Sequence, residues 1–124
     1  MKKQIGSEKA PAAIGPYSQA IEANGFVYCS GQLPIDVATG TMPEDIKEQT
    51  RVSLANVKAV LEAAGLGLDD VVKTTVYLAD MSLFGPMNEV YGETFKSPYP
   101  ARSAYAVKEL PKQALVEIEV IAAK

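Results

Sequence analysis

The sequence contains no histidine among its 124 residues. This absence excludes imidazole-based catalytic triads, histidine metal clusters and histidine acid–base catalysis. The GxGxxG, GxxxxGK and CxxC motifs are also missing, so the usual signatures of dinucleotide, phosphate-loop and dithiol sites are absent. Any chemistry in this chain must therefore come from carboxylates, arginine, lysine, tyrosine, serine and water.

Cysteine, basic charge and long hydrophobic runs are scarce as well. The single cysteine, Cys29, cannot form an intramolecular disulfide and indicates a reducing compartment, so we expect a cytoplasmic protein. Fifteen acidic against twelve basic residues give a net charge of −3, which disfavours nucleic acid as a partner. No hydrophobic run approaches the length that spans a membrane, so we expect no membrane association.

The sequence does contain enough hydrophobic residues for one core. With 48% hydrophobic side chains, it predicts a single domain over residues 1–124. A short strand is possible at Gln4-Ile5, and Asn24-Gly25 predicts a hairpin turn between strands at Tyr17–Ala23 and Phe26–Ser30. The last of these strands is apolar on both faces, so we expect it to be central and covered on both sides.

Two amphipathic helices follow. Thr41 and Glu44 form a capping-box pattern that predicts the start of the first helix, and Gly65 marks its end. The second helix is expected from about Leu83 to Phe95. The stripes expected to face the core are Ile46, Thr50, Leu54, Val57, Leu61 and Ala64 in the first helix, and Phe84, Met87, Tyr91 and Phe95 in the second.

Alternating patterns predict further strands at Val71–Ala79 and Leu115–Ala122, with an extended segment around Arg102 between them. In the first strand, Val72, Thr74, Val76 and Leu78 are expected to share one face and Val71, Lys73, Thr75 and Tyr77 the other. In the second, Val116, Ile118, Val120 and Ala122 form an apolar face. The order strand–strand–strand–helix–strand–helix–strand–strand predicts an α+β fold whose mixed sheet carries both helices on one face. The other face keeps apolar side chains, and we infer that self-association buries it.

Arg102 follows two prolines in the stretch Ser97–Val107. Each proline favours extended geometry in the residue before it, so Arg102 is expected at the start of a strand. An arginine at the start of a strand is well placed to bind a ligand. The alternative is an edge arginine in solvent or in a salt bridge.

Glu117 and Glu119 share one face of the last predicted strand with Leu115 and Ile121. Two glutamates would be costly in a core, while the two apolar neighbours would be out of place in water. A half-buried functional or intersubunit face satisfies both constraints. The alternative is an ordinary exposed edge, and strand parity alone does not choose between the two carboxylates.

Five stretches spread over nearly the whole chain form a further pattern. They are Ala10–Gln19 (APAAIGPYSQ), Ser30–Pro34 (SGQLP), Asn56–Gly65 (NVKAVLEAAG), Pro100–Ser103 (PARS) and Glu117–Glu119 (EIE). In this order and over this length, they resemble the RidA (YjgF) family of reactive-intermediate imine deaminases. Several motifs in the right order make the resemblance far more specific than any single signature.

The resemblance implies a chorismate-mutase-like α+β fold and a homotrimer with three clefts between subunits. It also implies hydrolysis, without cofactor or metal, of 2-aminoacrylate, 2-aminocrotonate and their imine tautomers to 2-keto acids and ammonia. This reaction would protect enzymes that use pyridoxal phosphate. The alternative is a non-catalytic trimeric sensor or binding protein for small 2-keto or amino acids. RNA cleavage, ascribed to some relatives, is disfavoured by the acidic balance and the absence of histidine.

The resemblance also implies roles for individual residues. Arg102 resembles the arginine that grips the substrate carboxylate, and Glu117 the glutamate that positions or activates water. The positions that match the lining of the family cleft are Tyr17, Ser30, Gly31 and Asn88, with Gly31 acting through its backbone N–H. Ala104 stands where many members have cysteine, so a thiol role is excluded there and only its carbonyl remains to hold water.

Simpler interpretations stay open for four of these residues. Tyr17 also fits a core aromatic of the hairpin, and Ser30 a polar strand end. Gly31 fits a plain bend as well as a close approach to a ligand. Asn88 lies off the apolar stripe of its helix and also fits a solvated surface residue.

Overall fold

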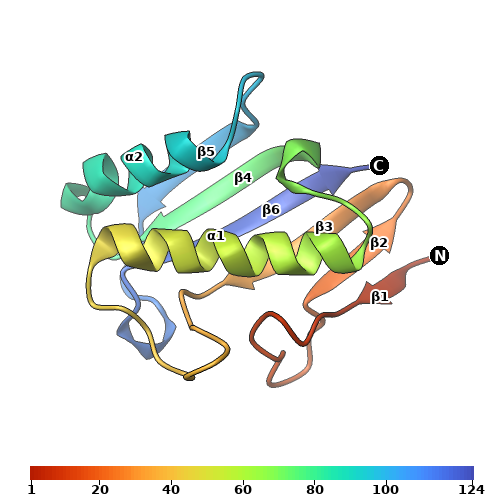
Figure 1. Cartoon of the computed structure of the whole chain (residues 1–124), viewed down its shortest axis with the longest axis horizontal. Helices are drawn as coiled ribbons and strands as arrows, with labels where there is room; N and C mark the ends of the chain where they lie inside the picture. The colour runs from red at the N-terminus through yellow and green to blue at the C-terminus, as the bar shows by residue number, and fades with distance from the viewer.

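The computed structural model describes all residues, 1–124, and contains six strands and two α-helices in the expected order (Figure 1). The elements are β1 (Lys3–Ile5), β2 (Ala20–Ala23), β3 (Phe26–Gln32), α1 (Ile46–Ala63), β4 (Val71–Leu78), α2 (Phe84–Thr94), β5 (Ala101–Ala106) and β6 (Val116–Ala123). Short 3-10 helices lie at Leu68–Asp70, Met81–Leu83 and Pro111–Gln113. The predicted α+β class and element order are confirmed.

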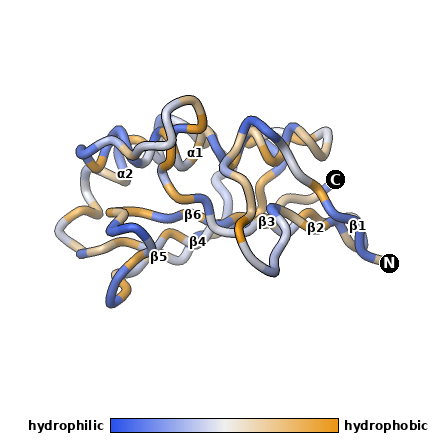
Figure 2. The backbone as a smooth tube through the Cα atoms, turned by 90° about the horizontal axis from the view of Figure 1, so that it is seen from below, coloured by the Kyte–Doolittle hydropathy of each residue, from blue (hydrophilic) through white to orange (hydrophobic).

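One mixed sheet contains all six strands in the order β1-β2-β3-β6-β4-β5. Strands β4 and β5 pair in parallel through the crossover helix α2, and every other neighbouring pair is antiparallel. Strand β6 inserts between β3 and β4, which are connected through α1. Figure 2 shows both helices on the same side of the sheet. The predicted mixed sheet with both helices on one face is therefore confirmed.

The core lies between the sheet and the two helices. In β6 the side chains of Val116, Ile118, Val120 and Ala122 are at most 2% exposed, as their alternation predicts. The predicted stripes of α1 and α2 pack against this face. Their end residues Ala64 and Phe84 are only partly buried, while the other stripe residues are buried.

Two buried polar residues of α1 form hydrogen bonds with the backbone at and just after the end of β3. The apolar stripe of the helix does not predict these bonds. Ser53 Oγ donates to the carbonyl of Gln32 at 2.7 Å. Asn56 Nδ2 donates to the carbonyls of Leu33 at 3.0 Å and Ile35 at 2.9 Å. Because buried carbonyls need partners, these bonds fix the path of the chain at the end of β3.

Helix α1 begins later than the capping-box pattern predicts. Its N-cap is Asp45, whose Oδ2 accepts the N–H of Glu48 at 3.1 Å. Thr41 belongs to a preceding turn, in which its carbonyl accepts the N–H of Asp36 at 2.9 Å. Aspartate is at least as good an N-cap as threonine, so the prediction chose the wrong one of two capable residues.

Strand β2 begins at Ala20 rather than at the predicted Tyr17. The N–H of Tyr17 donates to the carbonyl of Gly15 at 2.9 Å, which makes a tight turn just before the strand. The side chain of Gln19 is buried and donates to the carbonyl of Pro11 at 2.7 Å. Residues of the loop before β2 therefore form hydrogen bonds with one another instead of extending the hairpin strand.

Strand β4 has a register shift between Val71 and Lys73, opposite β6. Val71 is 7% exposed and Val72 is 44% exposed, which reverses the predicted facing of these two residues. The rest of the strand follows the prediction, because Thr74, Val76 and Leu78 are buried. An irregularity of this kind moves side chains on one side of it to the opposite face.

The face of the sheet opposite the helices is uncovered in this chain, and we call it the open face. By register it carries Phe26 and Tyr28 of β3, Lys73, Thr75 and Tyr77 of β4, Ser103 and Tyr105 of β5, and Glu117, Glu119 and Ile121 of β6. Phe26 is 39% exposed and Tyr28 is 46% exposed. The prediction that β3 is covered on both sides is therefore wrong for the single chain, and burial by self-association stays a prediction.

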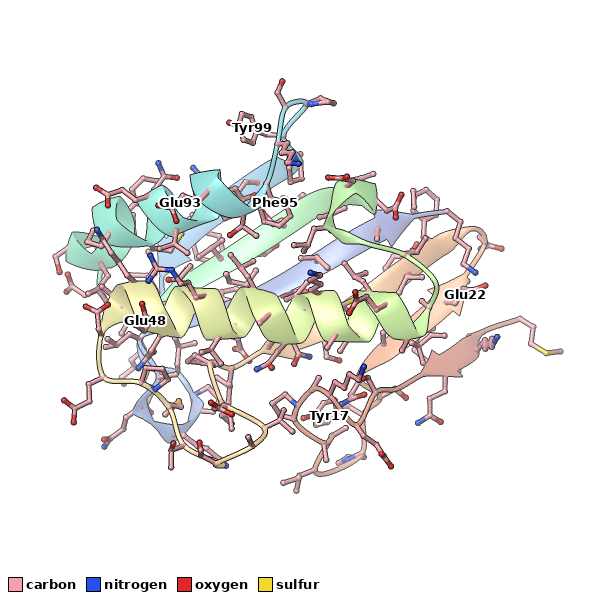
Figure 3. All side chains as sticks on the ribbon, in the orientation of Figure 1. Tyr17, Glu22, Glu48, Glu93, Phe95 and Tyr99 are labelled. Carbon is pink, nitrogen blue, oxygen red and sulfur yellow. The ribbon has the colours of Figure 1, made fainter.

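Ion pairs join α1 and α2 at the surface. Lys47 Nζ lies 2.6 Å from Glu89 Oε2, and Arg51 pairs with Glu48 of its own helix and lies 3.9 Å from Glu93 of α2. Figure 3 labels Glu48 on α1 and Glu93 on α2. Exposed pairs of this kind add little stability. Neither helix has the length and hydrophobicity needed to cross a membrane.

Candidate active site

Arg102 lies near the start of β5 and packs against α2. Its Cζ is 4.7 Å from the centroid of the Tyr91 ring and 5.3 Å from that of the Phe84 ring. Its Nη1 donates to Oδ1 of Asn88 at 2.7 Å. The ion pairs of the chain do not include Arg102. Two rings and an amide therefore hold this cation, and no carboxylate neutralises it.

Helix α2 and strand β4 provide the support for Arg102. Phe84, Asn88 and Tyr91 follow one another at spacings of four and three, which places them on one side of the helix. The hydroxyl of Tyr91 is 2.7 Å from Oγ1 of Thr74, the β4 residue that pairs in register with Arg102. Burial raises the pKa of the Tyr91 hydroxyl, so this ring stays neutral beside the cation.

A cavity of about 460 Å³ opens beside the guanidinium. Its lining residues are Asn88, Tyr91, Gly92, Tyr99, Pro100 and Arg102. A guanidinium has five N–H donors in a planar fork, and only one of them is used by Asn88. The remaining donors suit the two oxygens of a small carboxylate, which arginine can bind through two parallel hydrogen bonds.

Glu117 lies on the open face of β6, beside Gly31 of β3. A Cβ added to Gly31 would stand 2.9 Å from Cδ and Oε2 of Glu117, so any larger residue there would displace the end of the Glu117 side chain. The register of β3 and β6 is irregular between Cys29 and Gln32, which is where Gly31 lies. Burial, and then the charge of Glu119, raise the pKa of the Glu117 carboxyl.

Glu119 is held by a tyrosine of the neighbouring strand. The hydroxyl of Tyr77 donates to Oε1 of Glu119. The Tyr77 ring packs edge-on against that of Tyr105, with centroids 5.8 Å apart and an interplanar angle of 74°. The hydrogen bond to Glu119 raises the pKa of Tyr77 to about 12, with burial adding to the effect. Tyr77 is therefore a permanent donor at neutral pH.

Ser30 connects β3 to the loop that carries Tyr17. Its Oγ donates to the carbonyl of Ser18 at 2.7 Å, and its N–H donates to the carbonyl of Gln19 at 2.9 Å. Tyr17 itself is 54% exposed, which contradicts the alternative of a core aromatic. Figure 3 shows Tyr17 on the opposite side of the molecule from Tyr99, which lines the cavity at Arg102.

No residue of this chain is placed to carry out thiol chemistry. Ala104 is partly buried, lies on the same face of β5 as Arg102 and packs against the core. Cys29 is buried and its pKa is raised to about 12, so it stays an unreactive thiol, as a small core residue would. No group of three or more cysteine, aspartate or glutamate side chains is placed to hold a metal ion.

The residues predicted to form the site fall into two groups within one chain. Arg102 and Asn88 lie on the helix side of the sheet, at the edge strand β5. Glu117 and Gly31 lie at the open face, and β4 stands between β6 and β5. One chain therefore does not bring Arg102 and Glu117 together, and we call the two separate groups of predicted residues half-sites.

The sequence analysis missed the residues that support each half-site. Tyr91 and Phe84 are expected only as parts of a buried stripe, although the asparagine between them faces the same cation. Their spacing to Asn88 is the signal that would have found them. Tyr77 has a weaker signal, because only the register of β4 with β6 brings a tyrosine next to the two glutamates.

Fold and half-sites together describe a small α+β protein with an unneutralised arginine on one side of its sheet and a half-buried carboxyl on the other. The family model described as Endoribonuclease L-PSP matches residues 7–124. A RutC family protein of Pyrococcus horikoshii is 57% identical over 100% of this chain and 99% of its own length. This chain belongs to the Rid (YjgF/RutC) family.

Relatives with more informative names are similar over the same length. The 2-iminobutanoate/2-iminopropanoate deaminase of Salmonella typhimurium is 47% identical over 100% of this chain and 99% of its own. The crystal structure of Escherichia coli TdcF with bound serine matches with a TM-score of 0.95 and 44% identity, covering 98% of both chains. The fold is therefore that of solved members of the family.

Proposed function

We propose that this chain is a cofactor-independent deaminase that hydrolyses 2-enamino and 2-imino acids to 2-keto acids and ammonia. The observation that carries the proposal is the guanidinium of Arg102, which Asn88 and Tyr91 hold in place and which has no carboxylate partner in the chain. Relatives that are named 2-iminobutanoate/2-iminopropanoate deaminase support this substrate class. We place the reaction in the cytoplasm, where the single unpaired cysteine would stay reduced.

The active unit in this proposal is a homotrimer that associates through the open face. Arg102 and Glu117 lie on opposite sides of one sheet, so both can meet one small ligand only if they come from different subunits. The exposed rings of Phe26 and Tyr28 supply apolar surface for the association. Each of three clefts would then receive Arg102 from one subunit and Glu117 from its neighbour.

Binding in the cleft would fix one end of the substrate. The free N–H groups of Arg102 hold the substrate carboxylate, and Asn88 keeps the guanidinium in plane. Tyr17 and Ser30 line the cleft from the neighbouring subunit, together with the backbone N–H of Gly31. The carbonyl of Ala104 holds water near the reacting carbon.

The reaction needs proton transfer and one water molecule. An enamine first gains a proton at C3, the carbon doubly bonded to the amino-bearing carbon, and loses one from nitrogen, which gives the imine. As water adds to the carbon of the C=N bond, the Glu117 carboxylate takes a proton from it and the nitrogen gains one. The C–N bond then breaks as the hydroxyl loses its proton and the carbonyl forms, and nitrogen leaves as ammonia. One water is consumed and no oxidation occurs.

A coupled assay tests the proposal. A serine or threonine dehydratase generates the imine in place, semicarbazide traps it, and added protein is expected to suppress the semicarbazone. Arg102→Ala is expected to lower kcat/KM roughly 100-fold, because about two charge-assisted hydrogen bonds to the substrate are lost. Arg51→Ala is the matched control, since Arg51 pairs only with Glu48 and Glu93 at the surface. Equal activity of the wild type and Arg102→Ala, or an inert wild type, would contradict the proposal.

A second candidate is a non-catalytic trimer that binds small 2-keto or amino acids in the same cleft. The observation that favours it is the E. coli TdcF structure, which is described with bound serine. Calorimetric binding of 2-ketobutyrate or serine by a wild type that leaves the semicarbazone unchanged would support this candidate. The arginine variant is expected to lose the binding.

We do not propose RNA cleavage, although the matching family model is described as an endoribonuclease. The net charge of −3 provides little attraction for a phosphate backbone, and histidine is absent as an acid–base catalyst. A lack of ribonuclease activity in the purified wild type would agree with this choice.

A further inference from the structure

The two carboxylates of β6 are adjacent on the open face but are held differently. Glu117 and Glu119 are two residues apart on one strand, so their Cα atoms are separated by about 7 Å. Tyr77 pairs in register with Glu117, yet its hydroxyl reaches the next position and donates to Glu119. Glu119 therefore has a fixed partner, whereas no side chain donates to Glu117 in the chain.

No cation of the chain neutralises this pair. Lys73, on the same face of β4, directs its Nζ to Oγ of Ser103 at 3.0 Å and forms no ion pair with either glutamate. The other titratable groups on the surrounding strands of the open face are the hydroxyls of Tyr28 on β3, Tyr77 on β4 and Tyr105 on β5. A tyrosine is uncharged at neutral pH, so Glu119 is the charged group nearest along the strand to Glu117.

We propose that Glu119 is a positioning residue for Glu117. The hydroxyl of Tyr77 fixes the Glu119 carboxylate, and the negative charge held there opposes ionisation of Glu117 beside it. The inference rests on the proposed function for its catalytic meaning, since Glu117 is the group that exchanges protons with water and nitrogen.

The physical basis is repulsion between like charges in a poorly solvated place. Burial of Glu117 beside Gly31 is the larger cause of its raised pKa, and the second negative charge on Glu119 disfavours ionisation further. A carboxyl that titrates closer to neutral pH is a better general acid and base for a reaction near pH 7. Tyr77 contributes by holding Glu119 in place, because a carboxylate free to turn into water would be screened.

A direct titration tests the inference without any need for turnover. The protein is labelled with ¹³C at the glutamate side-chain carboxyls, and the Glu117 signal is assigned by its loss in Glu117→Gln. In Glu119→Gln the midpoint of that signal is expected to fall by about 0.5 to 1.5 pH units, the range for two charges as far apart as their Cα atoms, about 7 Å, at effective dielectric constants between those of water and a protein surface. Glu62→Gln, an exposed change on α1, is the matched control and is expected to leave it unchanged.

The Tyr77→Phe background tests the role of the hydroxyl. There, Glu119→Gln is expected to shift the Glu117 midpoint by less than half as much, because the carboxylate is no longer held. An equal shift in both backgrounds would overturn the role of Tyr77. An unchanged Glu117 midpoint in Glu119→Gln would overturn the whole inference.

The pH dependence of kcat/KM adds the catalytic readout. The rate is expected to fall as pH drops through the pKa of Glu117, because the carboxylate must be free to take a proton from water. Glu119→Gln is expected to move this acid limb to lower pH by the same amount as the titration midpoint. A wild type without turnover would contradict the proposed function but not this inference, which the titration decides alone.

Discussion

At the scale of single residues, Gly31 is the position where one added methyl group has the clearest consequence. A Cβ there would stand 2.9 Å from the Glu117 carboxyl, and the φ of Gly31 is one that other residues can adopt. Gly31→Ala is therefore expected to fold but to push the Glu117 side chain away. We expect kcat in the coupled assay to fall at least about tenfold, since small misplacements of a proton-transfer group are costly.

The matched control for this prediction is Gly67→Ala. An added Cβ at Gly67 meets nothing within 4 Å, and its φ is −135°, so neither activity nor thermal stability should change appreciably. A Gly31→Ala protein with wild-type kcat would show that the position of Glu117 is not critical.

The raised pKa of Glu117 also has a consequence for stability. The folded protein binds this proton more tightly than the unfolded chain, whose glutamates titrate near 4.5. Stability is therefore expected to fall as pH rises from that value through the raised pKa, and Glu117→Gln removes this loss. Urea unfolding at one protein concentration should show Glu117→Gln to be more stable than the wild type at about pH 8, with a smaller difference at about pH 4. A variant less stable at the higher pH would contradict this account.

At the scale of elements, the start of α1 offers a direct choice between two caps. Asp45→Ala removes the side chain that accepts the N–H of Glu48, and it is expected to lower the free energy of unfolding by about 1 kcal/mol. Thr41→Ala changes a residue of the preceding turn and is expected to cost much less. Chemical denaturation of both variants measures the difference. A larger loss of unfolding free energy for Thr41→Ala would show that Thr41 is the N-cap, as the sequence pattern predicts.

The strands show which local patterns determine structure and which do not. The alternation in β6 correctly predicted its buried face, because both register shifts place the extra residue in the neighbouring strand, β3 or β4, and leave β6 itself uninterrupted. The same reasoning failed at Val71 and Val72, where the irregular pairing of β4 reverses the facing. A register shift depends on the partner strand, which is distant in sequence, so alternation within one strand cannot reveal it.

At the scale of the whole molecule, the two half-sites predict complementation between inactive subunits. Arg102→Ala and Glu117→Gln are each expected to be inactive alone. In a mixed trimer, one of the three clefts combines an intact Arg102 from one subunit with an intact Glu117 from the next. We therefore expect about one third of the wild-type activity per mixed trimer. Co-expression with two tags and tandem purification provides the sample.

Two measurements accompany this prediction. Light scattering is expected to give three times the 13.2 kDa mass of the chain for the wild type and both variants. No recovery of activity in a correctly assembled mixture would place both residues in a single chain's site and contradict the intersubunit cleft.

The sequence of one chain predicted the order of elements and the common face of Glu117 and Glu119, but not the separation of Arg102 from Glu117. That separation follows from β4 lying between β5 and β6, a pairing that no local pattern encodes. The chain itself does not provide the expected cover over β3, since Phe26 and Tyr28 point away from its own helices. Residue types indicated what the half-sites contain, and topology determined where they lie.

The hydrogen bond from Ser30 to the carbonyl of Ser18 determines which end of a substrate Ser30 would contact in the proposed cleft. A hydroxyl has one hydrogen to donate, and Ser30 already gives it to its own chain. Toward a ligand Ser30 can therefore only accept, so it would favour the N–H end of an imino or enamino acid and repel a second carboxylate. With Arg102 holding the anionic end, the substrate would lie in one orientation, with its nitrogen on the side of Ser30 and Glu117.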